Sequence, residues 1–249
     1  MSREMNLFVV SDGMGGQASG EIASRLAVET VLAHCFESSS NSTYPFVGER
    51  IAGISETSNR LASGIRSANQ AILQTARASA AQRGMGATIV AVRCEGERMS
   101  VAHVGDSRAY RFRGNELEQL TRDHSLVAEQ VRYGELTEAE GSTSELQNVL
   151  LRGLGIDSEV EVDVTDELLV EGDLILLCTD GLTHEVPDTQ IASILRDASD
   201  PQEAANHLVN AANQAGGRDN ITAIVLRPFS QRIRAGRLGK WLRSLGDQS

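Results

Sequence analysis

Leu7-Phe8-Val9-Val10-Ser11-Asp12-Gly13-Met14-Gly15-Gly16 is the stretch that decides the fold of this 249-residue chain. Its first half is an apolar run within an expected strand over residues 5–11, and such a run predicts a buried strand. Its second half is a carboxylate followed by glycines, which have the backbone freedom that a tight turn needs. The stretch therefore predicts a strand that delivers Asp12 to one end of a sheet.

Two later stretches repeat this arrangement. The apolar residues 174–178 lead into Thr179-Asp180-Gly181, and Arg218-Asp219-Asn220 leads into the apolar residues 221–226. Asp-Gly is also common in ordinary turns, so each motif taken alone fits a turn. Three aspartates at strand ends, far apart in the sequence, together favour a metal site.

The residue types in these motifs suit a hard divalent cation. Mg²⁺ and Mn²⁺ prefer carboxylate, carbonyl and water oxygens, and the carbonyl of Gly13 can approach an ion closely because glycine has no side chain. No set of histidines and cysteines is available to favour zinc. Two such ions about 4 Å apart, sharing a carboxylate and a hydroxide, form an arrangement that attacks phosphoryl groups.

The composition narrows the class of protein. A formal net charge of -11 argues against nucleic acid as a main partner, because phosphate backbones need basic surfaces. Three scattered cysteines without CxxC spacing predict buried thiols in a reducing compartment, and we expect a cytoplasmic protein. The sequence has no signal peptide and no apolar run of about 18 residues, so it predicts no membrane span.

The order of the expected elements indicates an α+β fold with two packed antiparallel β-sheets, a β-sandwich flanked by helices. A strict alternation of strands and helices, as in a doubly wound parallel sheet, is not present. The expected helices are 20–36, 49–82 with a break near Gly64, 125–133, 189–196 and 202–215, with Asp188 or Asp200 as caps and Pro201 in a first turn. The expected strands after the first are 88–94, then 99–104, 109–113 and 117–120 as an antiparallel meander, then 160–164, 173–178 and 220–227. Residues 134–148 are expected to form a mobile surface segment.

Seven motifs in order carry a resemblance to a known family. They are Asp12-Gly13-Met14-Gly15-Gly16 with Gly20-Glu21; Gly86-Ala87-Thr88; His103-Val104-Gly105-Asp106-Ser107-Arg108; Leu120-Thr121-Arg122-Asp123-His124-Ser125; Leu151-Arg152-Gly153-Leu154-Gly155; Cys178-Thr179-Asp180-Gly181-Leu182; and Arg218-Asp219-Asn220-Ile221-Thr222. The chain resembles the metal-dependent protein serine/threonine phosphatases of type 2C in their compact bacterial form. The resemblance covers about residues 6–227, which predicts a catalytic domain over 1–228 and a separate tail over 229–249.

The resemblance implies roles for individual residues. Asp12 corresponds to the carboxylate that bridges two Mn²⁺ or Mg²⁺ ions, and Gly13 to the carbonyl ligand of the second ion. Asp180 and Asp219 correspond to the remaining ligands of the first ion, and Asp106 to a ligand of a third, weaker ion.

The same resemblance implies a reaction. A metal-bridging hydroxide attacks phosphoserine or phosphothreonine in proteins, without a phospho-enzyme, and the substrates are those of a serine/threonine kinase. Met14 stands where some members have a histidine, so no side-chain general acid is expected. We expect a monomer.

Two departures from the family pattern bear on activity. Members normally have an Arg-x-x-Asn-Glu/Gln-Asp segment before the first motif, but only eleven residues precede Asp12, and Arg3 lies too close to take that role. Either the start is missing, with Met1 or Met5 an internal methionine, or the chain lacks the arginine and an edge strand. A true lack favours the alternative of a catalytically weak or inactive phosphatase-like binding module, and a cation-stabilised structural domain is a third interpretation. His184 stands where the family has an aspartate for the third ion, which predicts a weakened or Mn²⁺-selective third site or, equally, an inert exposed histidine.

Other motif residues have structural interpretations. Arg108 fits an ion pair in a turn, Asp123-His124 fits a cap of the following helix, and His103 fits a satisfied core residue. In the tail, Arg232, Arg234, Arg237, Lys240 and Arg243 alternate with apolar residues. The tail could form an amphipathic helix, fold back on the acidic body or be disordered, and we do not expect it to hold the chain at a membrane.

Overall fold

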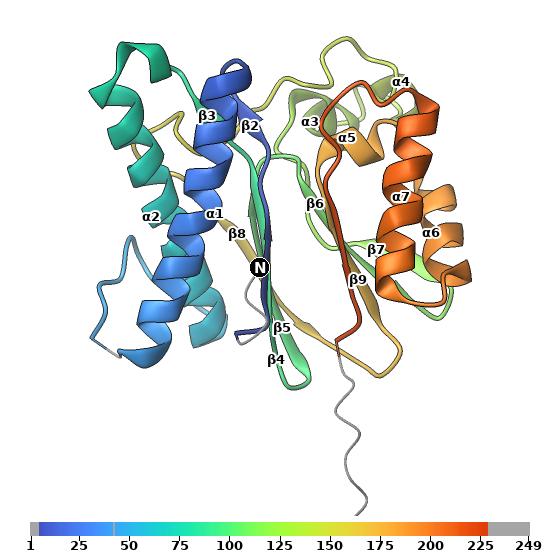
Figure 1. Cartoon of the computed structure of the whole chain (residues 1–249), viewed down its shortest axis with the longest axis horizontal. Coiled ribbons are helices and arrows are strands. Elements are labelled where there is room, and N and C mark those ends of the chain that lie inside the picture. The colour runs from blue at the N-terminus through green and yellow to red at the C-terminus, as the bar shows by residue number, and fades with distance from the viewer. Residues whose placement is uncertain (1–4, 42, 229–249) are drawn as a thin grey trace, which may run out of the picture.

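Two antiparallel four-stranded sheets pack face to face in the computed structural model, and helices cover the outer face of each sheet (Figure 1). The structure describes residues 5–41 and 43–228. The first sheet has the order β1 (Leu7–Val10), β4 (Ile89–Glu95), β5 (Arg98–Val104), β8 (Asp163–Leu168). The second has the order β10 (Ala223–Leu226), β9 (Leu174–Cys178), β6 (Arg108–Arg113), β7 (Glu116–Gln119). The predicted α+β sandwich is confirmed.

The central strands are buried on both faces, which explains their continuous apolar runs. In β4, Ile89 and Ala91 pack under the helices of the first sheet, whereas Val90 and Val92 pack between the two sheets. In β9, Leu176 lies under the helices of the second sheet and neighbouring residues face the first sheet. Successive side chains of a strand point to opposite faces, so one strand contributes to two separate cores.

Four helices form the outer layers. Helices α1 (Gln17–Ser40) and α2 (Glu56–Ala78) cover the first sheet, and α6 (Asp188–Asp197) and α7 (Pro201–Ala215) cover the second (Figure 1). Asp200 caps α7, because its side chain accepts hydrogen bonds from the backbone N–H of Gln202 and Glu203. The shorter elements are β2 (Gly13–Met14), η1 (Ala80–Gln82), β3 (Gly86–Ala87), α3 (Leu126–Arg132), α4 (Glu138–Gly141) and α5 (Asp180–Thr183).

The predicted helix over 49–82 was wrong at its start and in its break. Ser55 is the N-cap of α2, because its side chain accepts a hydrogen bond from the backbone N–H of Ser58. The helix is continuous through Gly64. A Cβ at Gly64 would lie 3.4 Å from Cδ2 of His34 on α1. The glycine therefore permits close helix packing rather than ending the helix.

The predicted meander was also wrong. β5 pairs with β4 and β8, whereas β6 crosses to the second sheet and pairs with β7 and β9. Of the three strands predicted for the meander, β6 and β7 form the expected hairpin, through Gly114 and Asn115, which both have positive φ angles. The loop that joins β5 to β6 therefore lies where the two sheets meet, and it carries Asp106.

Two smaller expectations, for β8 and for Asp188, need correction, and the predicted surface segment contains a short helix. β8 spans Asp163–Leu168 rather than 160–164. Its sequence is polar, so it has no apolar strand pattern. One of its polar residues, Asp166, accepts hydrogen bonds from the side chains of Ser55 and Ser58. The segment 134–148 contains α4, which begins with a capping box. The N-cap of α6 is Pro187, so Asp188 is not a cap.

The described residues include the three cysteines but not the predicted tail. The three cysteines are free and buried, as expected. The tail over 229–249 and Arg3 lie outside the described residues. Among the helices that the structure describes, none combines the length and apolar character that crossing a bilayer requires.

The sandwich predicts contrasting effects for two leucines. Leu176 is fully buried in the second sheet, whereas Leu168 at the end of β8 is 65% exposed. We expect Leu176→Ala to lower the free energy of unfolding by about 2–5 kcal/mol, because it removes buried methyl groups and leaves a cavity. Leu168→Ala should change it by less than about 0.5 kcal/mol. Urea unfolding of both variants measures this, and equal effects would contradict the described layers.

Candidate metal centre

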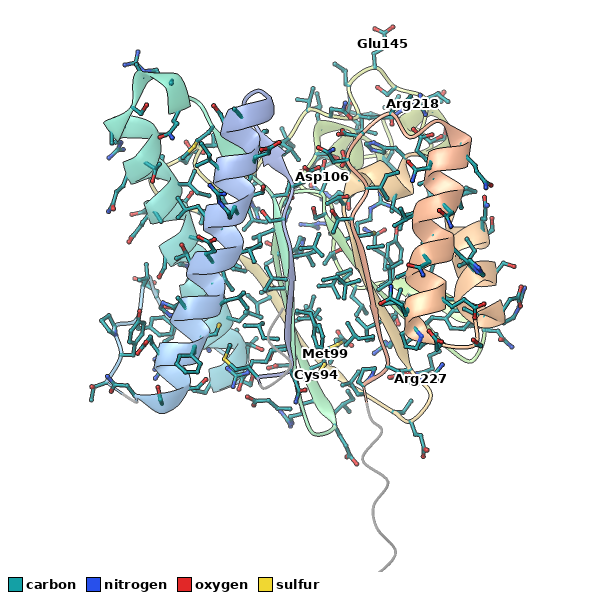
Figure 2. All side chains as sticks on the ribbon, viewed as in Figure 1. Cys94, Met99, Asp106, Glu145, Arg218 and Arg227 are labelled. Carbon is teal, nitrogen blue, oxygen red and sulfur yellow. The ribbon has the colours of Figure 1, made fainter. Side chains whose placement is uncertain are left out.

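Four aspartates meet at one end of the sandwich. Asp12 follows β1, Asp106 lies in the loop between β5 and β6, Asp180 begins α5 after β9, and Asp219 precedes β10. All four line one cavity of about 160 Å³. Figure 2 shows Asp106 at this end of the molecule, with Met99 and Cys94 toward the opposite end. The cavity therefore forms where strand ends from both sheets converge.

Asp12 is held on both sides by backbone contacts. Its N–H donates to Oγ1 of Thr88 at 3.0 Å, and its carbonyl accepts the Thr88 N–H at 2.8 Å. Its Oδ1 accepts the N–H of Gly13 at 2.8 Å. Oγ1 of Thr88 also lies 2.7 Å from Oγ of Ser107. One threonine thus ties Asp12 to the loop that carries Asp106.

Gly13 occupies a position that admits no side chain. A Cβ there would lie 2.0 Å from the carbonyl oxygen of Gly20 in the first turn of α1. The backbone of Gly13 therefore lies directly against α1, and Gly13 itself lines the cavity. This contact explains why a glycine follows the first aspartate.

Asp180 presents an oxygen without a partner. It is 8% exposed, and its Oδ1 is buried with no hydrogen-bond partner in the described part of the chain. Its Oδ2 lies 3.6 Å from Nδ1 of His184, one turn further along. A buried carboxylate oxygen that makes no hydrogen bond is costly, unless a cation completes its surroundings.

Asp219 is the exposed member of the group. Its Oδ1 accepts the N–H of Asn220 at 2.7 Å. The neighbouring backbone is fixed to the start of α5, because Oγ1 of Thr179 donates to the carbonyl of Asn220 and accepts the N–H of Thr222. Asp219 and Asp180 are therefore held at a defined separation despite the 38 intervening residues.

Burial and neighbouring negative charge raise the proton affinity of two of these carboxylates, Asp12 and Asp106. Burial raises the pKa of Asp12 to about 7, and the negative charge of Asp180 adds to the effect. Burial also raises the pKa of Asp106 to about 7, again with a contribution from Asp180. Both shifts disfavour the ionised form of the carboxyl group. A divalent cation would reverse them by supplying positive charge.

The structure brings five of the six predicted site residues to this cavity. These are Asp12, Gly13, Asp106, Asp180 and Asp219. His184 contacts Asp180 but is exposed and does not line the cavity. The residues that line it without having been singled out for the site are Met14, Thr88, Asn148, Leu150 and Asn220. Of these, Asn148 and Leu150 carry no local sequence signal, because they reach the cavity from a loop.

Three structural interpretations of motif residues can also be judged. Arg108 makes a bidentate ion pair with Asp123, as expected for a structural pair. His103 is buried, and its Nε2 lies 2.8 Å from the carbonyl of Arg122, which confirms a satisfied core residue. The expected cap was wrong, because Ser125 and not Asp123-His124 caps α3.

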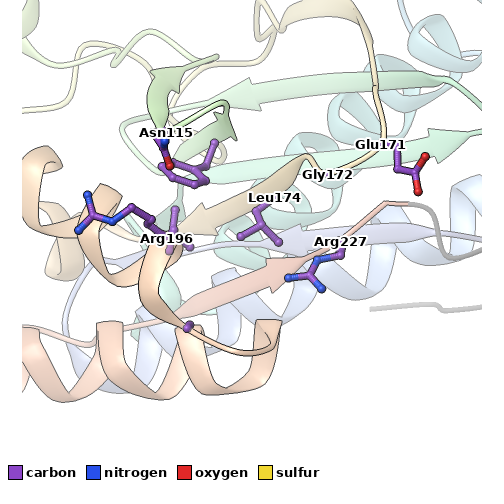
Figure 3. Close-up of a pocket in the computed structure, with 9 residues that line it drawn as sticks. Asn115, Glu171, Gly172, Leu174, Arg196 and Arg227 are labelled. Carbon is purple, nitrogen blue, oxygen red and sulfur yellow. The ribbon is translucent and has the colours of Figure 1, made fainter.

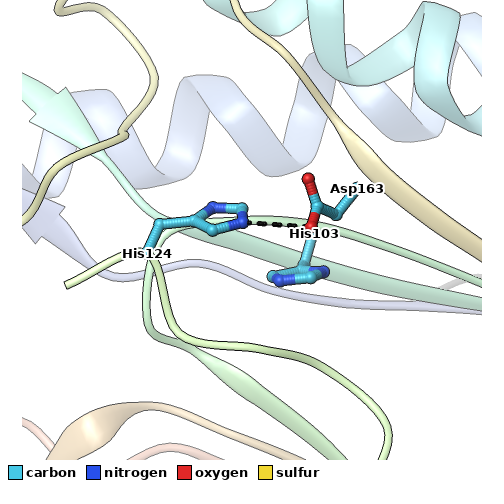
Figure 4. A group of neighbouring side chains, drawn as sticks. All are labelled: His103, His124 and Asp163. Atoms are coloured by element: carbon cyan, nitrogen blue, oxygen red, sulfur yellow. Dashed lines mark ion pairs between the residues drawn. The ribbon is translucent and has the colours of Figure 1, made fainter. Parts of the chain in front are cut away.

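A second cavity and a cluster of two histidines and an aspartate lie elsewhere in the described structure. A cavity of about 380 Å³ lies beside the β6–β7 hairpin and the end of α6 (Figure 3), and its charged lining residues are Glu171, Arg196 and Arg227. With two cations and a single acid, it does not suit a metal ion. His103, His124 and Asp163 form a compact cluster with ligand atoms within 4.8 Å of one another (Figure 4). Arg152 already places Nη1 2.6 Å from Oδ1 of Asp163 there.

Comparison with known proteins agrees with this geometry. The family model described as Protein phosphatase 2C matches residues 2–225. The serine/threonine phosphatase stp of Listeria monocytogenes is 35% identical over 229 residues, covering 92% of this chain and 87% of that protein.

Solved structures agree as well. The Mycobacterium tuberculosis serine/threonine phosphatase PstP/Ppp matches with a TM-score of 0.77 and 33% identity, over 88% of this chain and 87% of that one. The catalytic domain of PstP in complex with two manganese ions matches with a TM-score of 0.73 and 34% identity, over 88% and 86% of the two chains. The chain belongs to the protein phosphatase 2C family.

Proposed function

We propose that this chain removes phosphate from serine and threonine residues of proteins, using Mn²⁺ or Mg²⁺ ions held by Asp12, Asp180, Asp219 and the carbonyl of Gly13. The observation that carries the proposal is the buried, unpartnered Oδ1 of Asp180 in a cavity that three further aspartates line. As a member of the protein phosphatase 2C family, the chain is a metal-dependent protein serine/threonine phosphatase. The ligands and the number of ions are the proposed part.

The donor set fits the proposed ions. Four carboxylates and a backbone carbonyl are hard oxygen ligands, which Mg²⁺ and Mn²⁺ prefer. Burial, with a contribution from the charge of Asp180, raises the pKa values of Asp12 and Asp106, and the described lining of the cavity contains no lysine or arginine. When bound, divalent cations lower the pKa of water and offset the charge of a phosphoryl group.

The residues have separate roles in this proposal. Asp12 would be a ligand shared by the ions, since it lines the same cavity as Asp180 and Asp219. Gly13 would contribute only its carbonyl, and its contact with α1 would fix the direction of that carbonyl. Asp106 would hold a third ion. Met14 lines the cavity but cannot exchange a proton, and the four aspartates of the described lining are ion ligands in this proposal, so no lining side chain is assigned as a general acid.

A catalytically weak binding module is the alternative. The complete set of aspartates favours the enzyme, because a module that only binds partners has little use for them. The substrates would be phosphoproteins produced by a serine/threonine kinase. The location would be cytoplasmic, which agrees with three free, buried cysteines, and the chain would act as a monomer.

Loss of one ligand should separate the enzyme from the alternative. We expect Asp180→Asn to reduce Mn²⁺-dependent hydrolysis of a phosphothreonine peptide on the order of 100-fold or more, since even partners of metal ligands are typically worth 10- to 100-fold. Chelator should abolish turnover by the unchanged chain. Asp197→Asn, at an exposed aspartate of α6, is the control and should retain full activity. Mn²⁺ binding without turnover by the unchanged chain would favour the binding module.

The pKa shifts predict a pH-dependent stability of the metal-free chain. The pKa of Asp106 is raised to about 7 in the folded state, so its protonated form stabilises the fold below pH 4, and this contribution is lost as the pH rises toward 7 and beyond. Asp106→Asn has no carboxyl group to ionise, so its stability does not fall with rising pH in this way. In chelator, we expect the variant to gain stability relative to the unchanged chain between pH 5 and pH 8, on the order of 1 kcal/mol or more.

Urea unfolding at both pH values measures the difference. Asp219→Asn serves as a comparison, because Asp219 is exposed and should show a smaller change. A stability difference between Asp106→Asn and the unchanged chain that is independent of pH would contradict the prediction.

His184 offers a test of the third ion. Its Nδ1 lies 3.6 Å from Oδ2 of Asp180, and imidazole is a poorer ligand for Mg²⁺ than a carboxylate. We expect His184→Asp to increase the Mg²⁺ affinity of the weakest site, and His184→Ala to reduce its Mn²⁺ affinity about tenfold. Calorimetric titration measures both, with the exposed His207→Ala as control. Unchanged third-ion affinity in His184→Ala would show that His184 is not a ligand.

A further inference from the structure

His124 is bonded to the residue before Asp106 through two separate contacts. Its backbone N–H donates to the carbonyl of Gly105 at 3.1 Å, and its ring Nδ1 accepts the N–H of Gly105 at 3.1 Å. Gly105 has a φ angle of 104°, and a Cβ there would lie 2.7 Å from the side chain of Thr88. This backbone conformation sets the direction in which the chain leaves toward Asp106, and His124 holds it from both sides.

The same residue holds the loop that closes the cavity. The carbonyl of His124 accepts the N–H of Leu151 at 2.8 Å, and the N–H of Leu126 donates to the carbonyl of Val149 at 2.8 Å. Residues 124–126 and 149–151 therefore run side by side. Asn148 and Leu150, within or next to this loop segment, line the cavity.

The far side of the ring faces a half-buried ion pair between Asp163 and Arg152. Nδ1 accepts a hydrogen bond and therefore carries no proton, whereas Nε2 lies 3.4 Å from Oδ2 of Asp163 (Figure 4) and 3.1 Å from Nη1 of Arg152. Arg152, at the end of the loop segment 148–152, places Nη1 2.6 Å from Oδ1 of the same carboxylate. Hydrogen bonds from His124 and then from Arg152 hold the pKa of Asp163 well below its usual range.

The cluster is not well suited to a metal ion. A metal ligand uses a ring nitrogen that carries no proton, and the unprotonated nitrogen of His124 is already occupied by the N–H of Gly105. Arg152 supplies the positive charge that Asp163 requires. His103 stacks on the ring of His124, with ring centroids 4.7 Å apart, and restricts its rotation. These contacts leave His124 in one orientation.

We propose that His124 is a positioning residue that couples the loop carrying Asp106 to the loop segment 148–152 over the cavity. A displacement of either loop would require breaking bonds to the same residue, so the two would move together. The part of this proposal that concerns metal affinity rests on the proposed function, because it takes Asp106 as a ligand of the weaker ion. The mechanical coupling of the two loops does not depend on that role.

The first test measures hydrogen–deuterium exchange by mass spectrometry on the full chain without metal. His124→Leu removes the ring acceptor and leaves the Gly105 N–H unpaired, so we expect faster exchange in both 103–108 and 148–153. His124→Asn should restore protection of 103–108, because its Oδ1 can replace Nδ1 as acceptor. His34→Leu is the matched control: His34 is 4% and His124 6% exposed, but His34 bonds Ser67 in the α1–α2 layer. Faster exchange in only one of the two segments would overturn the coupling.

The second test measures Mn²⁺ affinity by calorimetric titration. We expect His124→Leu to weaken the Asp106-dependent ion about 10- to 100-fold and His124→Asn to stay close to the unchanged chain. In an Asp106→Asn background, His124→Leu should have no further effect on Mn²⁺ binding, whereas general destabilisation would add to it. Additive effects would overturn the positioning role. If Asp106→Asn alone left Mn²⁺ binding unchanged, the proposed ligand role would fail, and the exchange experiment would still decide the coupling.

Discussion

The mutual repulsion of four carboxylates at one end of the sandwich is the constraint on which the rest of this structure depends. Asp12, Asp106, Asp180 and Asp219 come from different elements and line one cavity, and two of them have raised pKa values. A flexible scaffold would relieve this repulsion by letting the side chains separate. Here each aspartate follows or precedes a strand that is itself packed in the sandwich, so separation would require a strand to move.

Rigidity at the cavity comes from contacts that involve small residues. Gly13 lies against the carbonyl of Gly20, and Gly181 lies against that of Asn220. The hydroxyl of Thr88 bonds the segment after β1 and the loop before β6. The hydroxyl of Thr179, at the end of β9, makes two bonds to the segment before β10. These contacts replace side-chain bulk with direct backbone packing, which allows strand ends from both sheets to approach the cavity closely.

The sequence predicts this molecule best where burial is complete. The runs in β1 and β9 are apolar throughout because both faces are covered, and they were recognisable without other information. β8 was misplaced because it is an edge strand with polar residues that bond α2. The crossing of β6 to the second sheet was missed, since pairing between distant strands leaves no local pattern.

The candidate site divides in the same way. The aspartates could be identified because each has a short motif at the end of an apolar run. Asn148 and Leu150 could not, because only tertiary structure brings their loop to the cavity. The network of His124, Asp163 and Arg152 was missed for the same reason: Asp163 belongs to the misplaced β8, and its partners lie in separate motifs.

The pairing of β1 with β4 has a consequence for how this protein folds. Val10 lies opposite Val90, and both long helices of the first layer occur between them in the sequence. Contacts between residues so far apart form slowly, because a long loop must close before any contact compensates for the lost entropy. Thr88, which fixes Asp12, reaches its place only when this pairing is complete. A cation held by these aspartates would therefore require the pairing of β1 with β4 to form first.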